Sequence, residues 1–206
     1  MSTNGNRICV FCGSSPGARP AYAAATTSLA RQLARAGIAI VYGGSNVGLM
    51  GLLADAALSA GGEVIGVIPR SLQAREVAHT GLSELRVVES MHERKALMAE
   101  LSDAFVALPG GFGTFDELCE ILTWPQLDLQ RAPCGILNVE GYYDHLLEMF
   151  DNAEAEGFIK PEHRRMVISD DRPESLVSRL LECKVPAVDK WIGQATDSRK
   201  SHHSPK

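Results

Sequence analysis

The chain passes from strand to helix at Pro109-Gly110-Gly111-Phe112-Gly113-Thr114-Phe115-Asp116-Glu117. Residues 104–108 before this stretch form an apolar run typical of a buried strand, and residues 115–127 after it have a helical pattern. Glycines at such a turn let the backbone approach a ligand and direct its N–H groups at it. Thr114 adds a hydroxyl at the expected helix start, where an anion is favoured, and Glu117 follows in the first turn. The stretch predicts a phosphate-binding turn beside a carboxylate, although a tight turn before a capped helix has the same pattern.

Two further loops of small residues also follow apolar runs. One is Tyr42-Gly43-Gly44-Ser45-Asn46-Val47-Gly48-Leu49-Met50-Gly51, and the other is Cys12-Gly13-Ser14-Ser15-Pro16-Gly17. In an open parallel sheet, the loops at the carboxyl ends of the strands lie along one edge, where ligands bind. We therefore expect the three loops to converge on one crevice.

Strand and helix patterns alternate along the chain, and the strand segments are apolar throughout rather than on alternate residues. Such runs indicate a sheet that is covered on both faces. The pattern predicts an α/β fold with a doubly wound, mostly parallel sheet, a Rossmann-like three-layer sandwich. We expect one domain over residues 1–188 and a disordered polar tail over 189–206. The expected strands are 7–11, 38–42, 64–68, 85–89, 103–108, 135–139 and 166–169, and the expected helices are 21–36, 48–60, 90–101, 114–127, 142–156 and 173–183.

Composition excludes several classes of function. The formal net charge is −5 and 45% of the residues are hydrophobic, so no basic excess suggests a nucleic-acid partner. No apolar run approaches the ~20 residues of a membrane span, and the first residues lack the core of a signal peptide. We expect a cytoplasmic protein without a membrane or nucleic-acid partner.

The sequence also argues against a metal or a nucleotide cofactor. Cys9 and Cys12 form a C-x-x-C, but no second ligand pair stands at zinc spacing, so no metal is expected. The first loop lacks G-x-G-x-x-G, and no acid follows the second strand to bind a ribose hydroxyl, which disfavours NAD. A Walker loop is absent as well, and we expect no cofactor.

A second group of candidate residues opens the helix before the Pro109 turn. Its sequence is Ser90-Met91-His92-Glu93-Arg94-Lys95. A helix N-terminus is where the macrodipole disfavours cations, so Arg94 and Lys95 are candidates for binding an anionic substrate. Solvated surface charges are the alternative explanation, and spacing alone does not choose between the two.

These two segments together resemble the paired signature of the LONELY GUY (LOG) family. The matching residues are Ser90-Met91-His92-x-Arg94-Lys95 and Pro109-Gly110-Gly111-x-Gly113-Thr114-x-x-Glu117. The resemblance extends from the Cys12 loop to Asn138-Val139-x-Gly141-Tyr142-Tyr143 and covers roughly residues 7–180. Ser45 stands where many members have glycine, and Pro125-Gln-Leu-Asp128 also departs from the usual pattern, in a segment that resembles the family's subunit contact.

The resemblance implies a hydrolase that acts on cytokinin riboside 5′-monophosphates and AMP and releases the free base and ribose 5-phosphate. It implies a homodimer, no cofactor, and Arg94 and Glu117 as the catalytic pair. A carboxylate suits this reaction because the breaking glycosidic bond leaves positive charge on the ribose. A nucleosidase for another nucleoside 5′-monophosphate and a non-catalytic nucleotide-binding protein remain alternatives. The residues expected to bind substrate or phosphate are Gly43, Gly44, Gly48, Gly51, Arg94, Lys95, Gly110, Gly111, Gly113, Thr114 and Glu117.

Overall fold

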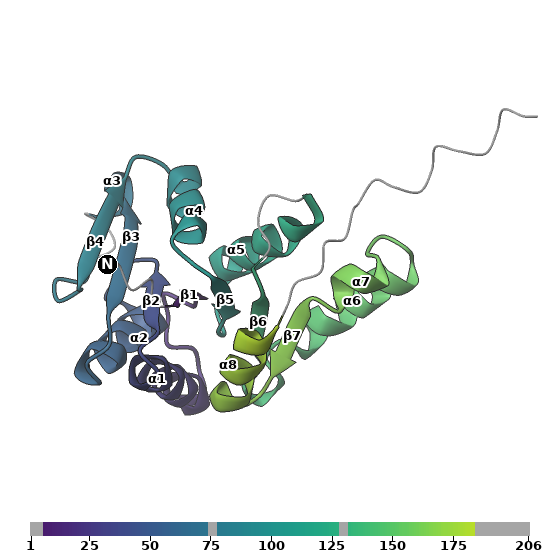
Figure 1. Cartoon of the computed structure of the whole chain (residues 1–206), viewed down its shortest axis with the longest axis horizontal. Helices are drawn as coiled ribbons and strands as arrows, with labels where there is room; N and C mark the ends of the chain where they lie inside the picture. Colours follow the sequence, from purple (N-terminus) through teal and green to yellow (C-terminus); the bar gives the residue numbers. More distant parts are fainter. Residues whose placement is uncertain (1–5, 74–77, 128–131, 184–206) are drawn as a thin grey trace, which may run out of the picture.

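A seven-stranded sheet forms the centre of the protein, with every neighbouring pair of strands parallel (Figure 1). The computed structural model describes residues 6–73, 78–127 and 132–183. The strand order is β4-β3-β2-β1-β5-β6-β7. The strands are β1 (Arg7–Phe11), β2 (Ala39–Tyr42), β3 (Val64–Pro69), β4 (Glu84–Val88), β5 (Ala104–Ala107), β6 (Cys134–Leu137) and β7 (Val167–Asp170).

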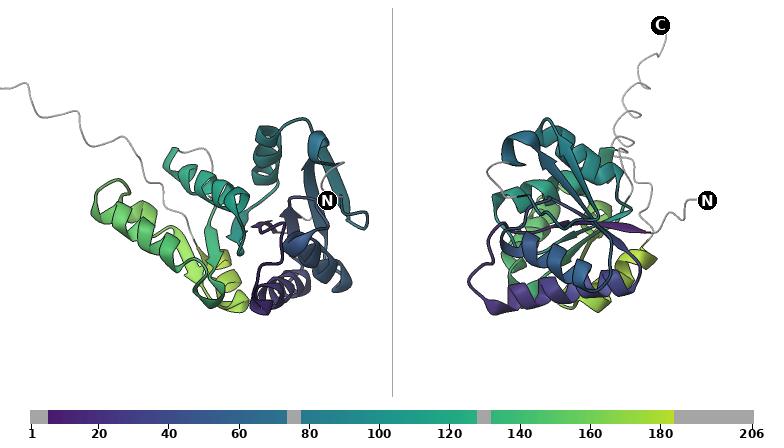
Figure 2. Two further views of the ribbon diagram at one scale, coloured as in Figure 1. Left: turned by 180° about the vertical axis from the view of Figure 1, so that it is seen from behind. Right: turned by 90° about the vertical axis from the view of Figure 1, so that its left-hand side faces the viewer.

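Helices cover both faces of the sheet, which lies between them in the side view of Figure 2. Helices α1, α2 and α8 pack on one face, and α4, α5 and α6 pack on the other. The longer helices are α1 (Pro20–Arg35), α2 (Gly48–Ser59), α4 (Met91–Glu100), α5 (Phe112–Thr123), α6 (Asp144–Ala155) and α8 (Pro173–Glu182). Short helical turns are α3 (Arg70–Gln73), η1 (Pro125–Leu127), η2 (Val139–Gly141) and α7 (Pro161–Arg164).

The alternation of side chains along each strand builds two separate cores. In β1, Ile8 and Val10 join the core beneath α1 and α2, whereas Cys9 and Phe11 join the core beneath α4 and α5. Successive side chains of a strand point to opposite faces, so a strand covered on both sides must be apolar at every position. This confirms the α/β, doubly wound, Rossmann-like fold predicted from the sequence.

Several element boundaries differ from the prediction for local reasons. Helix α5 begins two residues before Thr114 and ends at Thr123, because Pro125 interrupts it and the chain continues as the turn η1. The helix expected from residue 142 begins at Asp144, after a turn in which Glu140 has a positive φ of 50°. The expected boundary at residue 188 and the tail over 189–206 lie outside the described residues.

The strand order places one reversal of direction at the centre of the sheet. From β1 the chain proceeds through β2 and β3 to the edge strand β4, and then returns to pair β5 with the other side of β1. In doubly wound sheets, ligands bind at such a switch point, beyond the carboxyl ends of the strands. None of the described helices is both long and apolar enough to cross a membrane.

Candidate functional site

The loops after β1, β2 and β5 meet at the switch point, as the sequence predicted. The backbone N–H of Gly13 donates to the carbonyl of Pro109 at 3.1 Å, and the N–H of Leu49 donates to the carbonyl of Gly13 at 3.0 Å. Gly48 has a φ of +58°, and a Cβ there would overlap the backbone of Ser14. The β1 loop is therefore held between the other two by direct backbone contacts.

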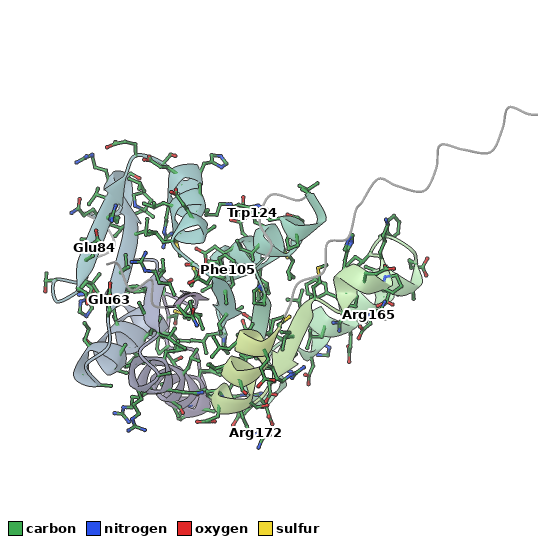
Figure 3. All side chains as sticks on the ribbon, viewed as in Figure 1. Glu63, Glu84, Phe105, Trp124, Arg165 and Arg172 are labelled. Atoms are coloured by element: carbon green, nitrogen blue, oxygen red, sulfur yellow. The ribbon has the colours of Figure 1, made fainter. Side chains whose placement is uncertain are left out.

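A pocket of about 210 Å³ opens between these loops and the helices α4 and α5. Phe105, labelled in Figure 3, lies on β5, the strand that leads into the turn, and Trp124 marks the far end of α5. Of the residues predicted to bind or react, the lining includes Gly43, Arg94, Gly111, Gly113, Thr114 and Glu117. The structure thus brings together residues from segments that are more than 50 positions apart in the chain.

The N-terminus of α5 faces the pocket. Gly111 is the N-cap residue, and its carbonyl accepts a hydrogen bond from the N–H of Phe115 at 3.1 Å. The N–H groups of Phe112, Gly113 and Thr114 precede this bond and have no partner inside the helix. A Cβ placed on Gly111 or Gly113 would meet nothing within 4 Å, so space is available in front of these donors. Free N–H groups and the helix dipole together suit a phosphate or another anion.

Arg94 contributes a buried positive charge to the pocket. Its side chain comes from the first turn of α4 and the residue is 7% exposed. Its Nε donates to the carbonyl of Val67 and its Nη2 to the carbonyl of Gly43, each at 3.1 Å. A Cβ on Gly43 would overlap this guanidinium, which explains the glycine at the end of β2. Among the described residues, no carboxylate forms an ion pair with Arg94, so an anionic ligand would supply the missing counter-charge.

Glu117 lines the same pocket from the first turns of α5. Burial raises the pKa of its carboxyl group to about 7, and the positive charge of Arg94 opposes this increase. A carboxyl group with a pKa near neutrality can gain or lose a proton during a reaction. Glu117 is therefore the pocket residue best suited to act as an acid, a base or a stabilising carboxylate.

Lys95 is not among the residues that line the pocket. Its Nζ lies 3.1 Å from Oδ2 of Asp116 and 3.0 Å from Oε2 of Glu120. These contacts join α4 to α5. The substrate contact predicted for Lys95 is therefore not visible in the geometry.

The remaining predicted glycines shape the loops rather than this pocket. A Cβ on Gly51 would overlap the backbone of Asn46, and a Cβ on Gly110 would overlap the side chain of Thr114. Gly44 has a φ of +76° and turns the chain at the end of β2. Close packing at these three positions sets the course of the backbone on either side of the crevice.

A second hollow of about 280 Å³ adjoins the pocket and shares Gly13, Ser14 and Gly111 with it. Tyr142, from the loop after β6, and Gly110 also line this hollow. No role was predicted for Tyr142, although it stands in the Asn138–Tyr143 segment that carries part of the family resemblance. A larger hollow of about 850 Å³ lies over the outer side of α1 and contains none of the predicted site residues.

Comparisons with known proteins find relatives over most of the chain. A family model described as "Possible lysine decarboxylase" matches residues 50–180. The chain is 47% identical over 196 residues to the cytokinin riboside 5′-monophosphate phosphoribohydrolase LOG of Oryza sativa subsp. japonica, covering 95% of this chain and 80% of that protein. It is 49% identical over 176 residues to LOG7 of Arabidopsis thaliana, a protein with the same enzyme name, covering 85% and 81%.

Solved structures share the fold at much lower sequence identity. The molybdenum cofactor binding protein of Rippkaea orientalis superposes with a TM-score of 0.66 and 22% identity, covering 86% of this chain and 96% of that one. A similarity at this level concerns the arrangement of the strands and helices alone.

Proposed function

Because the chain belongs to the LOG family of phosphoribohydrolases, we propose that it hydrolyses the N-glycosidic bond of cytokinin riboside 5′-monophosphates and of AMP. The products are the free base and ribose 5-phosphate. The observation that carries the proposal is the presence of the α5 N-terminus, Arg94 and Glu117 in one pocket. An anion site, a buried cation and a carboxyl group that exchanges its proton near neutral pH each suit one part of this hydrolysis.

In the proposed reaction, the 5′-phosphate binds to the free N–H groups at the start of α5. Thr114, which is 3% exposed, adds its hydroxyl at the base of this cradle, and Gly111 and Gly113 leave room for the phosphate oxygens. The ribose then lies next to Glu117. Because the glycosidic bond breaks with positive charge on the ribose, the Glu117 carboxylate stabilises that charge and accepts a proton from the attacking water.

Arg94 supplies the positive charge that the reaction requires on the other side of the bond. Electrons of the breaking bond move to the departing purine, and a fixed guanidinium offsets the negative charge that develops there. Two backbone carbonyls hold the side chain in place before the substrate arrives. A cation fixed in this way needs no rearrangement during the reaction, which is the main advantage of a preorganised site.

The description "Possible lysine decarboxylase" does not fit the residues present. A decarboxylase of that kind uses pyridoxal phosphate, which binds through a lysine as a Schiff base. Among the described residues that line the pocket there is no lysine, and Lys95 is paired with Asp116 and Glu120. No step of the proposed reaction depends on this cofactor.

Product analysis tests the proposal directly. Purified protein without added cofactor is incubated with AMP or with isopentenyladenosine 5′-monophosphate, and the release of base and ribose 5-phosphate is measured. The wild type and an Asp116→Asn control are expected to release base, whereas Glu117→Gln is expected to lose at least about a hundredfold in rate. Base release by Glu117→Gln at the wild-type rate would contradict the mechanism, and no release by the wild type from either nucleotide would contradict the function.

We also propose that the protein is a homodimer and works in the cytoplasm. Large apolar side chains on the α4 and α5 side are exposed, including Phe112 at 92% and Met91 at 42%. Such side chains near the site would be covered by a second copy. All five cysteines are free, which suits a reducing compartment. A monomeric mass in light scattering at micromolar concentration would refute the dimer, and fractionation of cells tests the location.

A further inference from the structure

The turn between β5 and α5 is fixed through three consecutive carbonyl groups. The carbonyl of Leu108 accepts a hydrogen bond from the hydroxyl of Tyr143 at 2.7 Å. The carbonyl of Pro109 accepts from the N–H of Gly13 at 3.1 Å. The carbonyl of Gly110 accepts from the hydroxyl of Tyr142. Each peptide group that leads into the phosphate cradle therefore has its orientation set by a donor from another loop.

The contact of Tyr142 determines where the N–H of Gly111 points, the donor directly before the free N–H groups at the start of α5. The carbonyl of Gly110 and the N–H of Gly111 belong to the same planar peptide group, which is trans. In a trans peptide these two bonds point in opposite directions. Because the carbonyl of Gly110 faces Tyr142 in the second hollow, the N–H of Gly111 points away from that hollow. Gly111 also lines the pocket that contains Arg94 and Glu117.

This peptide group needs an external restraint. It joins two glycines, and without Cβ atoms on either side it can rotate between orientations that larger residues would exclude. A rotation of the group would turn a carbonyl oxygen, rather than an N–H, towards the phosphate. The restraint therefore decides whether the cradle attracts or repels an anion at this position.

Tyr142 is itself held firmly enough to provide this restraint. Its ring makes edge-to-face contacts with Tyr22 at a centroid distance of 5.6 Å and with Tyr143 at 5.0 Å. The loop that carries it is fixed by Asn138, whose side chain accepts from the N–H of Tyr143 and donates to Asp144, both at 2.7 Å. The hydroxyl of Tyr142 thus reaches Gly110 from a rigid support on the neighbouring strand β6.

We propose that Tyr142 is a positioning residue for phosphate binding, acting through the Gly110–Gly111 peptide group and not by contact with the substrate. The inference rests on the proposed function in that the phosphate is taken to be part of a nucleotide. This proposal gives the second hollow, which Tyr142 and Gly110 line, a role in the reaction. It gives the hydroxyl of Tyr142, and not only its aromatic ring, a role at this point.

The test compares Tyr142→Phe with Tyr22→Phe. Both variants keep an aromatic ring in the cluster and lose one hydroxyl, and among the described residues the hydroxyl of Tyr22 has no hydrogen-bond partner. The affinity for inorganic phosphate and for adenosine is measured by calorimetry, together with KM and kcat for AMP and the thermal unfolding temperature. In Tyr142→Phe we expect about fivefold weaker phosphate binding and a similar increase in KM, with kcat and the affinity for adenosine nearly unchanged. Tyr22→Phe should match the wild type.

The outcomes separate this inference from the proposed function. Unchanged phosphate affinity in Tyr142→Phe, or an equal loss of phosphate and adenosine affinity, would overturn the positioning role. The same would follow if Tyr22→Phe had an equal effect or if the wild type bound no phosphate. If the wild type binds phosphate but releases no base from AMP or isopentenyladenosine 5′-monophosphate, and Tyr142→Phe still weakens phosphate binding, the proposed function fails while the positioning role stands.

Discussion

Replacing Glu117 by glutamine should stabilise the folded protein at high pH while it abolishes activity. Burial raises the pKa of Glu117 from 4.5 to about 7 in the folded protein. The unfolded chain has the lower pKa, so the folded state binds this proton more tightly. The stability that comes from proton binding is complete below about pH 4.5 and is lost as the pH rises through about 7. A glutamine is neutral at every pH and does not suffer this loss.

The size of the effect follows from the difference between the two pKa values. At about 1.4 kcal/mol per pKa unit, the ionisation of Glu117 in the pocket costs about 3 kcal/mol of folding free energy above pH 8. At pH 5 the cost falls below about 1 kcal/mol, because the folded protein keeps the proton there. The free energy of unfolding of Glu117→Gln should therefore exceed that of the wild type by about 3 kcal/mol at pH 8.5 and by less than about 1 kcal/mol at pH 5.

Urea denaturation followed by far-ultraviolet circular dichroism at the two pH values measures this difference. Asp116→Asn is the matched control, since it removes the same charge from the preceding position of α5, where the side chain is exposed and paired with Lys95. The control should change stability by no more than about 1 kcal/mol at either pH, because the exposed Asp116 contributes only a minor part of the Glu117 pKa shift, after burial. If Glu117→Gln is less stable than the wild type at pH 8.5, or if the difference does not depend on pH, the carboxyl group is not desolvated and its assigned role is wrong.

Three further predictions concern the same pocket. The kcat/KM for AMP should rise with pH through about 7 and then level off, because the reaction uses the carboxylate of Glu117; a pH profile that is flat or falling between pH 5.5 and 8.5 would contradict this. Gly111→Val should fold normally, since a Cβ there meets nothing within 4 Å, but should weaken nucleotide binding at least about tenfold. Gly110→Ala should instead lower the unfolding temperature, because its Cβ would overlap Thr114. If the two variants changed nucleotide affinity and unfolding temperature to the same extent, the phosphate site at the start of α5 would be contradicted. Lys95→Met should cost about 1–2 kcal/mol of stability through the lost contacts between α4 and α5 and leave KM within about twofold, and a tenfold increase in KM would instead support the predicted substrate contact.

The fold was predictable because a sheet buried on both faces requires strands that are apolar at nearly every position, and the sequence shows such runs. Central strands such as β1 and β2 are apolar at nearly every position, and the glycine loops mark their carboxyl ends. The edge strand β4 is different, because Arg86 and Val87 are exposed where the strand has a neighbour on one side alone. The short helices α3 and α7 were not predicted, since four residues are too few for a helical pattern of apolar positions.

The difference between Arg94 and Lys95 could not be predicted from their positions. Both occupy the first turns of α4, and both are cations where the helix dipole is unfavourable. Successive helical residues point about 100° apart, so one side chain turns towards the sheet and the other towards a neighbouring helix. The packing of α4 against β3 selects Arg94 for the pocket, with the carbonyl of Val67 as its partner, and leaves Lys95 for Asp116. Which residue enters the site is thus a property of tertiary packing.

Arg94 and Glu117 line one pocket without forming a direct ion pair, and this arrangement matters for catalysis. A direct ion pair between them would satisfy the buried guanidinium and lower the pKa of the carboxyl group, and the two charges would then be occupied with each other. Instead, the carbonyls of Val67 and Gly43 hold the guanidinium, and the pKa of Glu117 stays near 7. A phosphate bound at the start of α5 adds negative charge beside Glu117, which by itself would favour the protonated and inactive form. The positive charge of Arg94 opposes that effect, so the side chain that would offset charge on the leaving base in the proposed reaction also favours the ionised form of Glu117.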